Sequence, residues 1–363
     1  MAADPGSLWR PMRRRARPLP LAIVLLFVCP FVAHAELKLP PGFTAQVYVS
    51  GQGFEAGSSG EGRGIPSTST LAFDRNGTLY LARTGRRYVS GGEVEDLWPL
   101  YRIPLGGARL TPATEKRYLL GPPLPNPVVA GIRGGRELFV TTYDRDRKVG
   151  VLYRLVDGGV EMFSGGTPPR GTPPSLMQPE GAAVDGDGNI YVADRAHGAI
   201  VKLDPAGRIV DPKWLAVARP RVLAMDEHGY LWVGSDGPAD APWQRGPGEI
   251  WRVSPQRETR VLVQGPIAAG ISLGPGGHLF VADRQAAKVF SVSPDGVTLE
   301  FATFSDGDAP RSLVFAPVSD ETRGAGIAGD LFVVAIRRGG WPINEVLRIS
   351  GPFGELAGKG AGR

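Results

Sequence analysis

A short sequence motif recurs along this chain, in which a turn rich in Gly and Asp leads into a small apolar strand. One copy reads Asp185-Gly-Asp-Gly-Asn-Ile-Tyr-Val-Ala-Asp194, with an aromatic residue early in the strand. The aromatic residues of the six copies, called anchors below, are Tyr80, Phe139, Tyr191, Trp232, Phe280 and Phe332. Their spacing of 41 to 59 residues is typical of a radial repeat in which each copy forms one small sheet. The sequence therefore predicts an all-β fold, a six-bladed β-propeller.

Each copy extends into a four-strand pattern. An apolar strand precedes the turn, as at 181–185, and a third strand follows the anchor strand, as at 200–203. Apolar and polar residues alternate with period two in these segments, which indicates strands rather than helices. Most copies add a fourth strand, but the last copy shows none. We expect residues 43–49, ahead of the first copy, to supply it and so to close the ring without an open sheet edge.

The first 35 residues have the composition of an export signal. Four arginines at positions 13 to 17 precede an apolar run at 19–32, and Ala33-His34-Ala35 forms a small-x-small cleavage site. The apolar run of about 14 residues is shorter than the roughly 20 that a membrane-spanning helix needs. We expect a signal peptide at 1–35, with Met1 or Met12 as its start, a propeller at 36–355 and a flexible tail at 356–363. The predicted destination is periplasmic or secreted.

Removing this leader changes the charge balance of the chain. The leader carries five of the 41 basic residues and one of the 36 acidic residues, so the net charge falls from +5 to +1 without it. A nearly neutral chain favours neither nucleic acid nor an anionic membrane as a partner, and we expect no membrane span in the mature chain. Cys29, the only cysteine, also lies in the leader. Stability must therefore come from core burial and ring closure rather than from disulfides.

The strand order of a blade sorts the polar residues by face. The loop between the second and third strands lies at the mouth of the central channel, whereas the turn between the first and second strands lies on the opposite face. His228 and His278 belong to first turns, where we expect them to act as turn residues. His197 lies in a loop at the mouth. It is the candidate catalytic base, with a plain loop residue as the alternative.

Arginines are frequent among the residues predicted at the mouth. A guanidinium binds a carboxylate or phosphate through two parallel hydrogen bonds, so converging arginines favour an anionic ligand. The predicted ligand- or cofactor-binding residues are Arg195, Arg221, Arg284, Arg311, Arg337 and Arg338. Asp194 and Asp283 end the third and fifth copies with the shared motif Val-Ala-Asp. For these two residues, the alternative to a ligand site is a structural role in which they bind backbone amides.

Carboxylates at the mouth are the candidate metal ligands. Glu180 and Asp236, with Asp194, offer oxygens of the kind that calcium prefers. The segment 185–189 also has a calcium-like composition, but it lacks the EF-hand spacing and the closing Glu, so we expect a hairpin turn there. The sequence contains no Gly-x-Ser-x-Gly, cysteine cluster, His-Glu-x-x-His or phosphate-binding loop.

Two resemblances follow from these residues. The segment 179–197, continued at 200–207, resembles an NHL repeat, and the middle blades fit that pattern best. The two ends resemble the soluble glucose/sorbosone dehydrogenase family. Residues 39–48 are similar to its opening strand, and the segments 309–317, 329–335 and 340–349 are similar to its last blade.

The dehydrogenase resemblance implies an exported six-bladed propeller that uses pyrroloquinoline quinone, with calcium, to oxidise an aldose or sorbosone. The quinone is a tricarboxylate held over the channel mouth, and Arg311, Arg337 and Arg338 fit that picture. The family's early Arg-His stretch, which supplies the base for the sugar hydroxyl, is not found in this chain. His197 would therefore have to take that role from a different blade.

Two other functions stay open. One is a calcium-dependent hydrolase similar to gluconolactonase, in which Glu180 would help to polarise a lactone carbonyl. That family's asparagine pair is not evident, because Asn126 and Asn344 are the only asparagines outside hairpin turns. The other is a non-catalytic NHL-type propeller that binds a protein or glycan, with an envelope protein as partner. The predicted small-molecule ligand is an anion or a sugar.

Overall fold

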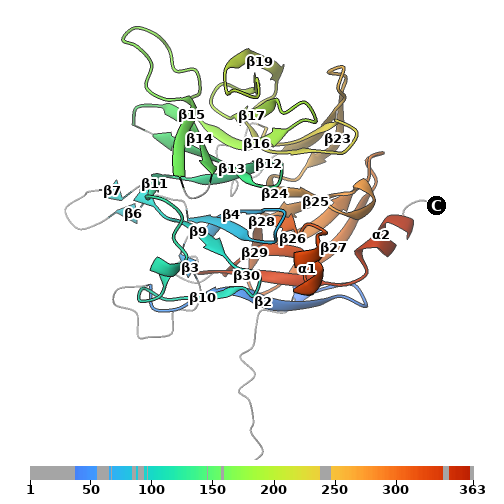
Figure 1. The fold of residues 1–363 in the computed structure, drawn as a ribbon. Coiled ribbons are helices and arrows are strands. Elements are labelled where there is room, and N and C mark those ends of the chain that lie inside the picture. The colour runs from blue at the N-terminus through green and yellow to red at the C-terminus, as the bar shows by residue number, and fades with distance from the viewer. Residues whose placement is uncertain are drawn as a thin grey trace, which may run out of the picture. The chain divides into compact units, whose positions relative to one another are not determined.

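Six β-sheets each contain one of the six aromatic anchors, so that each copy of the motif forms one sheet (Figure 1). The computed structural model describes residues 37–54, 65–66, 68–83, 87–88, 94–95, 97–144, 146–156, 159–237, 247–337 and 343–359. The expected signal peptide lies outside these residues. No helix within them is long and apolar enough to cross a membrane.

Blades 2, 3 and 4 each contain four strands in chain order. Blade 2 consists of β12 (Val128–Arg133), β13 (Glu137–Asp144), β14 (Val149–Val156) and β15 (Gly159–Gly165). Blade 3 consists of β16 (Pro179–Val184), β17 (Ile190–Asp194), β18 (Ala199–Leu203) and β19 (Ile209–Ala216). Blade 4 consists of β20 (Pro220–Met225), β21 (Leu231–Ser235), β22 (Gly248–Val253) and β23 (Thr259–Gly265).

The remaining blades depart from this plan at their outer edges. Blade 5 has β24 (Ala268–Leu273), β25 (Leu279–Asp283), β26 (Lys288–Val292) and β27 (Thr298–Phe304), with β1 (Leu37–Lys38) on the edge of β27. Blade 1 has β4 (Thr68–Phe73), β5 (Leu79–Arg83) and β9 (Leu100–Ile103). Blade 6 has β28 (Ala309–Phe315), β29 (Leu331–Arg337) and β30 (Ile343–Ser350), with β3 (Ile65–Pro66) beside β30.

Short elements complete the described chain. They are β6 (Arg87–Tyr88) with β7 (Val94–Glu95), β8 (Leu97–Trp98) with β11 (Leu124–Pro125), the 3-10 turns Glu115–Arg117 and Pro275–Gly277, and the helices α1 (Asp320–Gly324) and α2 (Phe353–Lys359). Helix α2 includes the first part of the segment for which the sequence predicted a tail.

An N-terminal strand closes the ring. β2 (Thr44–Gly51) pairs antiparallel with β30 as the outer strand of blade 6, and β10 (Ala108–Leu110), which follows blade 1, pairs with β2 in parallel. Each inner strand contacts the inner strand of the next blade, and β28 of blade 6 contacts β4 of blade 1. The prediction of a six-bladed propeller closed by the N-terminal strand is therefore confirmed, and the strand covers an edge that would otherwise be open.

An aspartate in the first turn holds the anchor of three blades. In blade 3, Oδ1 of Asp185 accepts the amides of Asp187 and Asn189 at 3.0 and 2.8 Å, and Oδ2 accepts the Tyr191 hydroxyl at 3.1 Å. Blades 1 and 4 repeat the side-chain bond in the pairs Asp74–Tyr80 and Asp226–Trp232. Phe139 and Phe280 have no polar group to donate, and Arg133 and Gly274 replace the aspartate in their turns. The segment 185–189 is thus a hairpin turn, as predicted.

Candidate functional site

The inner strands of five blades carry a β-bulge at the same level. In blade 4, Pro220 pairs with Ser235 and Val222 with Gly234, which leaves Arg221 between them without a cross-strand partner. The corresponding residues of blades 1, 3, 5 and 6 are Ser69, Glu180, Ala269 and Arg311. A bulge redirects a side chain, and bulges are common beside functional sites. Three charged residues are thereby placed at the start of their inner strands, the end of the ring called the channel mouth here.

Asp236 joins blades 3 and 4 at this level. It follows β21 and is fully buried. Arg221 donates from Nε to Oδ1 at 2.9 Å and from Nη2 to Oδ2 at 2.5 Å. Arg195, which follows β17, donates from Nε and Nη2 to the same Oδ2 at 3.2 Å. One carboxylate thus receives two guanidinium groups from neighbouring blades.

Glu180 adds a second negative charge beside Arg221. Its Oε2 lies 3.7 Å from Arg221 Nη1, and its Oε1 accepts a hydrogen bond from Gln178 Nε2 at 3.1 Å. Burial alone would lower the pKa of Arg221, but the charge of Glu180 and the hydrogen-bonded charge of Asp236 outweigh it, so the pKa is raised. On the side of the mouth formed by blades 3 and 4, the arginines and carboxylates therefore pair with one another. Little of their charge is available to a ligand.

Arg311, in blade 6, has a different environment. Its Nη1 donates to the carbonyl oxygen of Thr68 at 3.4 Å, and no carboxylate among the described residues lies within ion-pair distance of it. Burial, followed by the charges of Arg284 and Arg221, lowers the pKa of Arg311 to about 9, against a smaller opposing effect of Glu180. Arg311 still carries its proton at neutral pH. The charge of Arg311 is therefore not paired by any carboxylate of the described residues.

Asn344 lies beside Arg311, and sequence reasoning did not place it in the site. It is fully buried, and its Nδ2 donates to the carbonyl oxygen of Thr68 at 2.7 Å, the acceptor that Arg311 also uses. Its Oδ1 is buried and has no hydrogen-bond partner among the described residues, which is uncommon in folded proteins. The only sequence signal was that Asn344 lies outside the hairpin turns. Its contact with blade 1 depends on ring closure, which a local motif does not reveal.

His197 is held by Asp194. Its Nδ1 lies 2.8 Å from Oδ2 of the buried Asp194 carboxylate, and its side chain is 27% exposed. An Nδ1 proton shared with the carboxylate leaves Nε2 as the basic nitrogen. Asp194 also accepts the backbone amides of Met177 and Gln178 at 2.8 and 3.0 Å. The structural role predicted for Asp194 as an acceptor of backbone amides is confirmed, and the same aspartate orients the candidate base.

The carboxylates predicted as metal ligands do not fit a calcium ion. Glu180 and Asp236 face Arg195 and Arg221, so a cation would have to displace guanidinium groups from both of them. Across the described ranges, no three His, Cys, Asp or Glu side chains are grouped so that they could hold a metal ion. Calcium prefers six to eight oxygen ligands, whereas both oxygens of Asp236 already accept hydrogen bonds from arginine and Oε1 of Glu180 accepts one from Gln178.

The remaining predicted arginines are only partly described. Arg284 follows β25 and lies close enough to Arg311 to influence its pKa. The backbone of Arg337 ends β29, but its side chain, like all of Arg338, lies outside the described residues. Of the six arginines predicted as one set, Arg195 and Arg221 are paired with Asp236, whereas Arg311 has no carboxylate within ion-pair distance in the described part of the chain.

Comparisons with known proteins found one family model and a number of solved structures that are similar to this chain. Residues 176–203 match the family model for the NHL repeat. A search of curated protein sequences finds no significant match. Virginiamycin B lyase from Staphylococcus aureus is 12% identical, covering 85% of this chain and 99% of its own, with a TM-score of 0.49. A protein with a proposed gluconolactonase assignment is 15% identical, covering 86% and 93%, also at 0.49.

A protein of unknown function from Bacteroides thetaiotaomicron has a TM-score of 0.52 at 9% identity, covering 87% of this chain and 77% of its own. At this identity, the likeness supports the fold alone. The chain is thus a six-bladed β-propeller with an NHL repeat in its third blade.

Proposed function

We propose that this protein is an exported propeller that binds a small carboxylate-bearing ligand at the channel mouth, with Arg311 as the main ligand-binding residue. The observation that carries the proposal is the environment of Arg311. It is a partly buried guanidinium with two arginines near it and no carboxylate of the described residues within ion-pair distance. A buried charge is costly unless it is paired, and an anionic ligand supplies the missing partner.

The ion-paired network narrows the set of ligand-binding residues. Arg195 and Arg221 already donate to Asp236, so their forks are not open to a second carboxylate. The ligand is therefore expected to bind Arg311, with Arg284 contributing charge from blade 5.

Within this ligand class, pyrroloquinoline quinone is the first molecule to test. It carries three carboxylates, and the ends of the chain resemble the quinone-dependent sugar dehydrogenases. Arg311 would hold one of its carboxylates, and the bound quinone would supply the acceptor for a sugar oxidation. His197, with Nε2 basic and its ring oriented by Asp194, is the residue proposed to take the proton of the sugar hydroxyl. In a non-catalytic NHL-type binder, by contrast, the same anion site would operate without a base.

Calorimetric titration of the purified exported protein with pyrroloquinoline quinone, and separately with citrate, tests the proposal. We expect Arg311→Met to weaken binding at least about tenfold, because a methyl thioether keeps the packing but not the charge. Arg323→Met is the matched control, since Arg323 is exposed on α1. Unchanged affinity in Arg311→Met, or no binding of either anion by the wild type, would overturn the anion site.

A second measurement separates the enzyme from the binding protein. The quinone-loaded protein is mixed with aldoses and a dye acceptor, and reduction of the dye is followed. Turnover that disappears in His197→Ala supports the dehydrogenase, whereas turnover that persists removes His197 from the mechanism. Anion binding without turnover, together with capture of an envelope protein, supports the non-catalytic alternative.

A further inference from the structure

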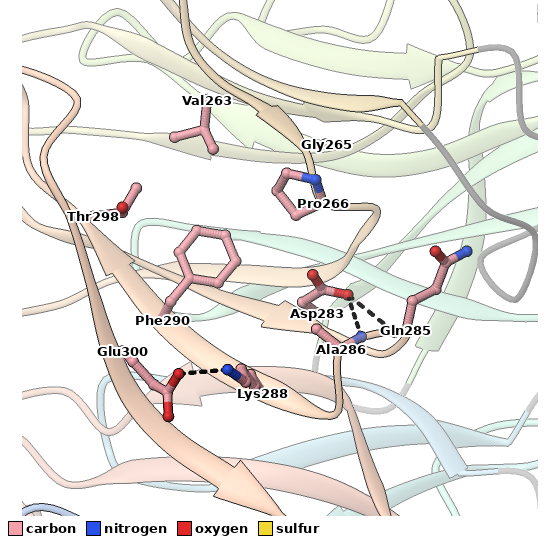
Figure 2. Close-up of a pocket in the computed structure, with 10 residues that line it drawn as sticks. All are labelled: Val263, Gly265, Pro266, Asp283, Gln285, Ala286, Lys288, Phe290, Thr298 and Glu300. Carbon is pink, nitrogen blue, oxygen red and sulfur yellow. Dashed lines mark hydrogen bonds and ion pairs between the residues drawn. The ribbon is translucent and has the colours of Figure 1, made fainter.

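A pocket of about 630 Å³ lies between blades 4 and 5, formed by residues that are not part of the channel-mouth site (Figure 2). Val263, Pro266 and Phe290 form its apolar wall. Lys288 and Glu300, on β26 and β27, form an ion pair of 2.5 Å on another side. The volume falls within the usual range for small-molecule sites.

Asp283 contributes an oxygen without a partner to this pocket. Its side chain is buried, with the residue 8% exposed. Oδ1 accepts the amides of Gln285 and Ala286 at 2.9 and 3.0 Å, whereas no group among the described residues donates to Oδ2. Figure 2 shows the second oxygen turned away from these amides, on the side of Pro266. The residue is largely buried, but this oxygen is accessible from the pocket and has no donor among the described residues, so it is available to a positively charged or hydrogen-bonding ligand.

The sequence explains why this oxygen is open. Asp283 occupies the position in blade 5 that Asp194 occupies in blade 3, because each ends the anchor strand and pairs with the first residue of the inner strand. In blade 3, Oδ2 receives the amide of Met177 and the ring of His197. The matching residues in blade 5 are Pro266, which has no N–H, and Ala286, which has no side-chain donor. Both donors are missing, and the pocket opens at the same place.

The charges of the pocket indicate the sign of its ligand. Asp283 and Glu300 are negative and Lys288 is positive, so the lining carries a net charge of −1. Lys288 is the cross-strand neighbour of Asp283, but it is bound to Glu300 and forms no ion pair with Asp283. The face of Phe290 attracts a cation as well, and the apolar wall suits an alkyl chain.

We infer that this pocket binds a primary alkylammonium ion, with the ammonium group on Asp283 Oδ2 and the alkyl stem against Phe290 and Val263. The ammonium replaces the two donors that blade 5 lacks, while Lys288 pairs with Glu300 rather than with Asp283. The ligand is a free amine. A lysine side chain presented by a peptide has the same chemistry and is distinguished by the test.

Calorimetric titration with pentylamine at neutral pH tests the inference, with 1-pentanol as the uncharged probe of the same length. We expect saturable binding of pentylamine and none of pentanol at concentrations up to about 10 mM. Asp283→Asn keeps an oxygen for the two backbone amides but replaces the anionic oxygen by an amide, so its affinity should fall at least about tenfold. Asp144→Asn is the matched control, because Asp144 Oδ1 accepts the amides of Asp146 and Arg147 in the same way.

A second variant closes the site by a different route. Ala286→His gives blade 5 the imidazole that covers the corresponding aspartate of blade 3, so pentylamine binding should be lost while all native charges remain. Equal binding of pentylamine and pentanol, or full affinity in both Asp283→Asn and Ala286→His, would overturn the inference. So would the absence of saturable binding by the wild type.

The source of the ammonium and the independence of the site are tested in two further titrations. Preferential binding of N-acetyl-lysine-methylamide over pentylamine would replace the free amine by a peptide lysine and so contradict the inference as stated. Pentylamine binding should be unchanged in Arg311→Met, whose defect is confined to the channel mouth. The amine site and the anion site can therefore fail separately.

Discussion

The anchor strands of blades 3 and 5 end with the same three residues, Val-Ala-Asp, yet the two aspartates differ in their hydrogen bonding. Asp194 has both oxygens occupied, by the amides of Met177 and Gln178 and by the ring of His197. Asp283 has one oxygen occupied by two amides and the other open to a pocket. The motif thus places a carboxylate in both blades. The donors around it decide whether the carboxylate stabilises the fold or remains available to a ligand.

Removal of the two carboxylates should give the largest difference between these blades. Asp194→Ala leaves several buried donors without an acceptor and should lower the free energy of unfolding by about 3 kcal/mol. Asp283→Ala leaves only two amides and should cost about 1 to 2 kcal/mol. Urea unfolding of both variants measures the difference. Equal losses would mean that the extra hydrogen bonds of Asp194 contribute nothing to stability.

The turns at the opposite ends of these anchor strands should respond differently to alkaline pH. Burial, and then the charge and hydrogen bond of Asp185, raise the pKa of Tyr191 above its ordinary value of 10.0. A raised pKa in the folded state means that the stabilisation is fully present below pH 10 and is lost as the pH rises through the folded value. Blade 5 has Phe280, whose side chain does not titrate, at this position.

Tyr191→Phe tests this asymmetry. The variant should be about 1 kcal/mol less stable than the wild type at pH 7, because it loses the hydrogen bond to Asp185. This difference in the free energy of unfolding should narrow above pH 10. There the wild-type protein loses stability, because ionisation of Tyr191 is unfavourable at a buried site beside a negative charge. Chemical unfolding at pH 7 and at a series of values above 10 measures the gap. A gap that stays constant over this range would contradict the assigned cause.

The repeat made the architecture predictable, because each copy contains its own turn and alternating strands. The missing outer strand of the last copy and the spare strand at 43–49 were enough to predict closure by β2. The bulges at Arg221 and Arg311 were not predictable, because a bulge is a mismatch between two strands and neither strand shows it alone. For the same reason, the sequence placed six arginines at the mouth but did not separate those paired with Asp236 from Arg311.

The open oxygen of Asp283, by contrast, was encoded locally. Once blades 3 and 5 are aligned on Tyr191 and Phe280, Pro266 falls opposite Met177 and Ala286 falls opposite His197. A proline cannot donate a backbone hydrogen bond, and an alanine side chain has no donor. Comparing copies within one chain therefore reveals a lost hydrogen bond that a motif search, which records only Val-Ala-Asp, does not detect.

The smallest expected effect comes from returning one donor to blade 5. Pro266→Ala restores an N–H at the position of the Met177 amide, which should form a hydrogen bond to Asp283 Oδ2 that stabilises the fold by about 1 kcal/mol. Replacing proline also frees the unfolded chain, which costs about 0.4 to 1 kcal/mol. The two terms nearly cancel, so the free energy of unfolding should change by less than about 0.5 kcal/mol.

Pentylamine affinity should nevertheless fall several-fold, because the new amide competes for the same oxygen while no charge has changed. Paired unfolding and titration measurements separate the two effects. A variant with wild-type amine affinity would show that the missing N–H does not control access to Oδ2, and the difference between the blades would then rest on Ala286 alone.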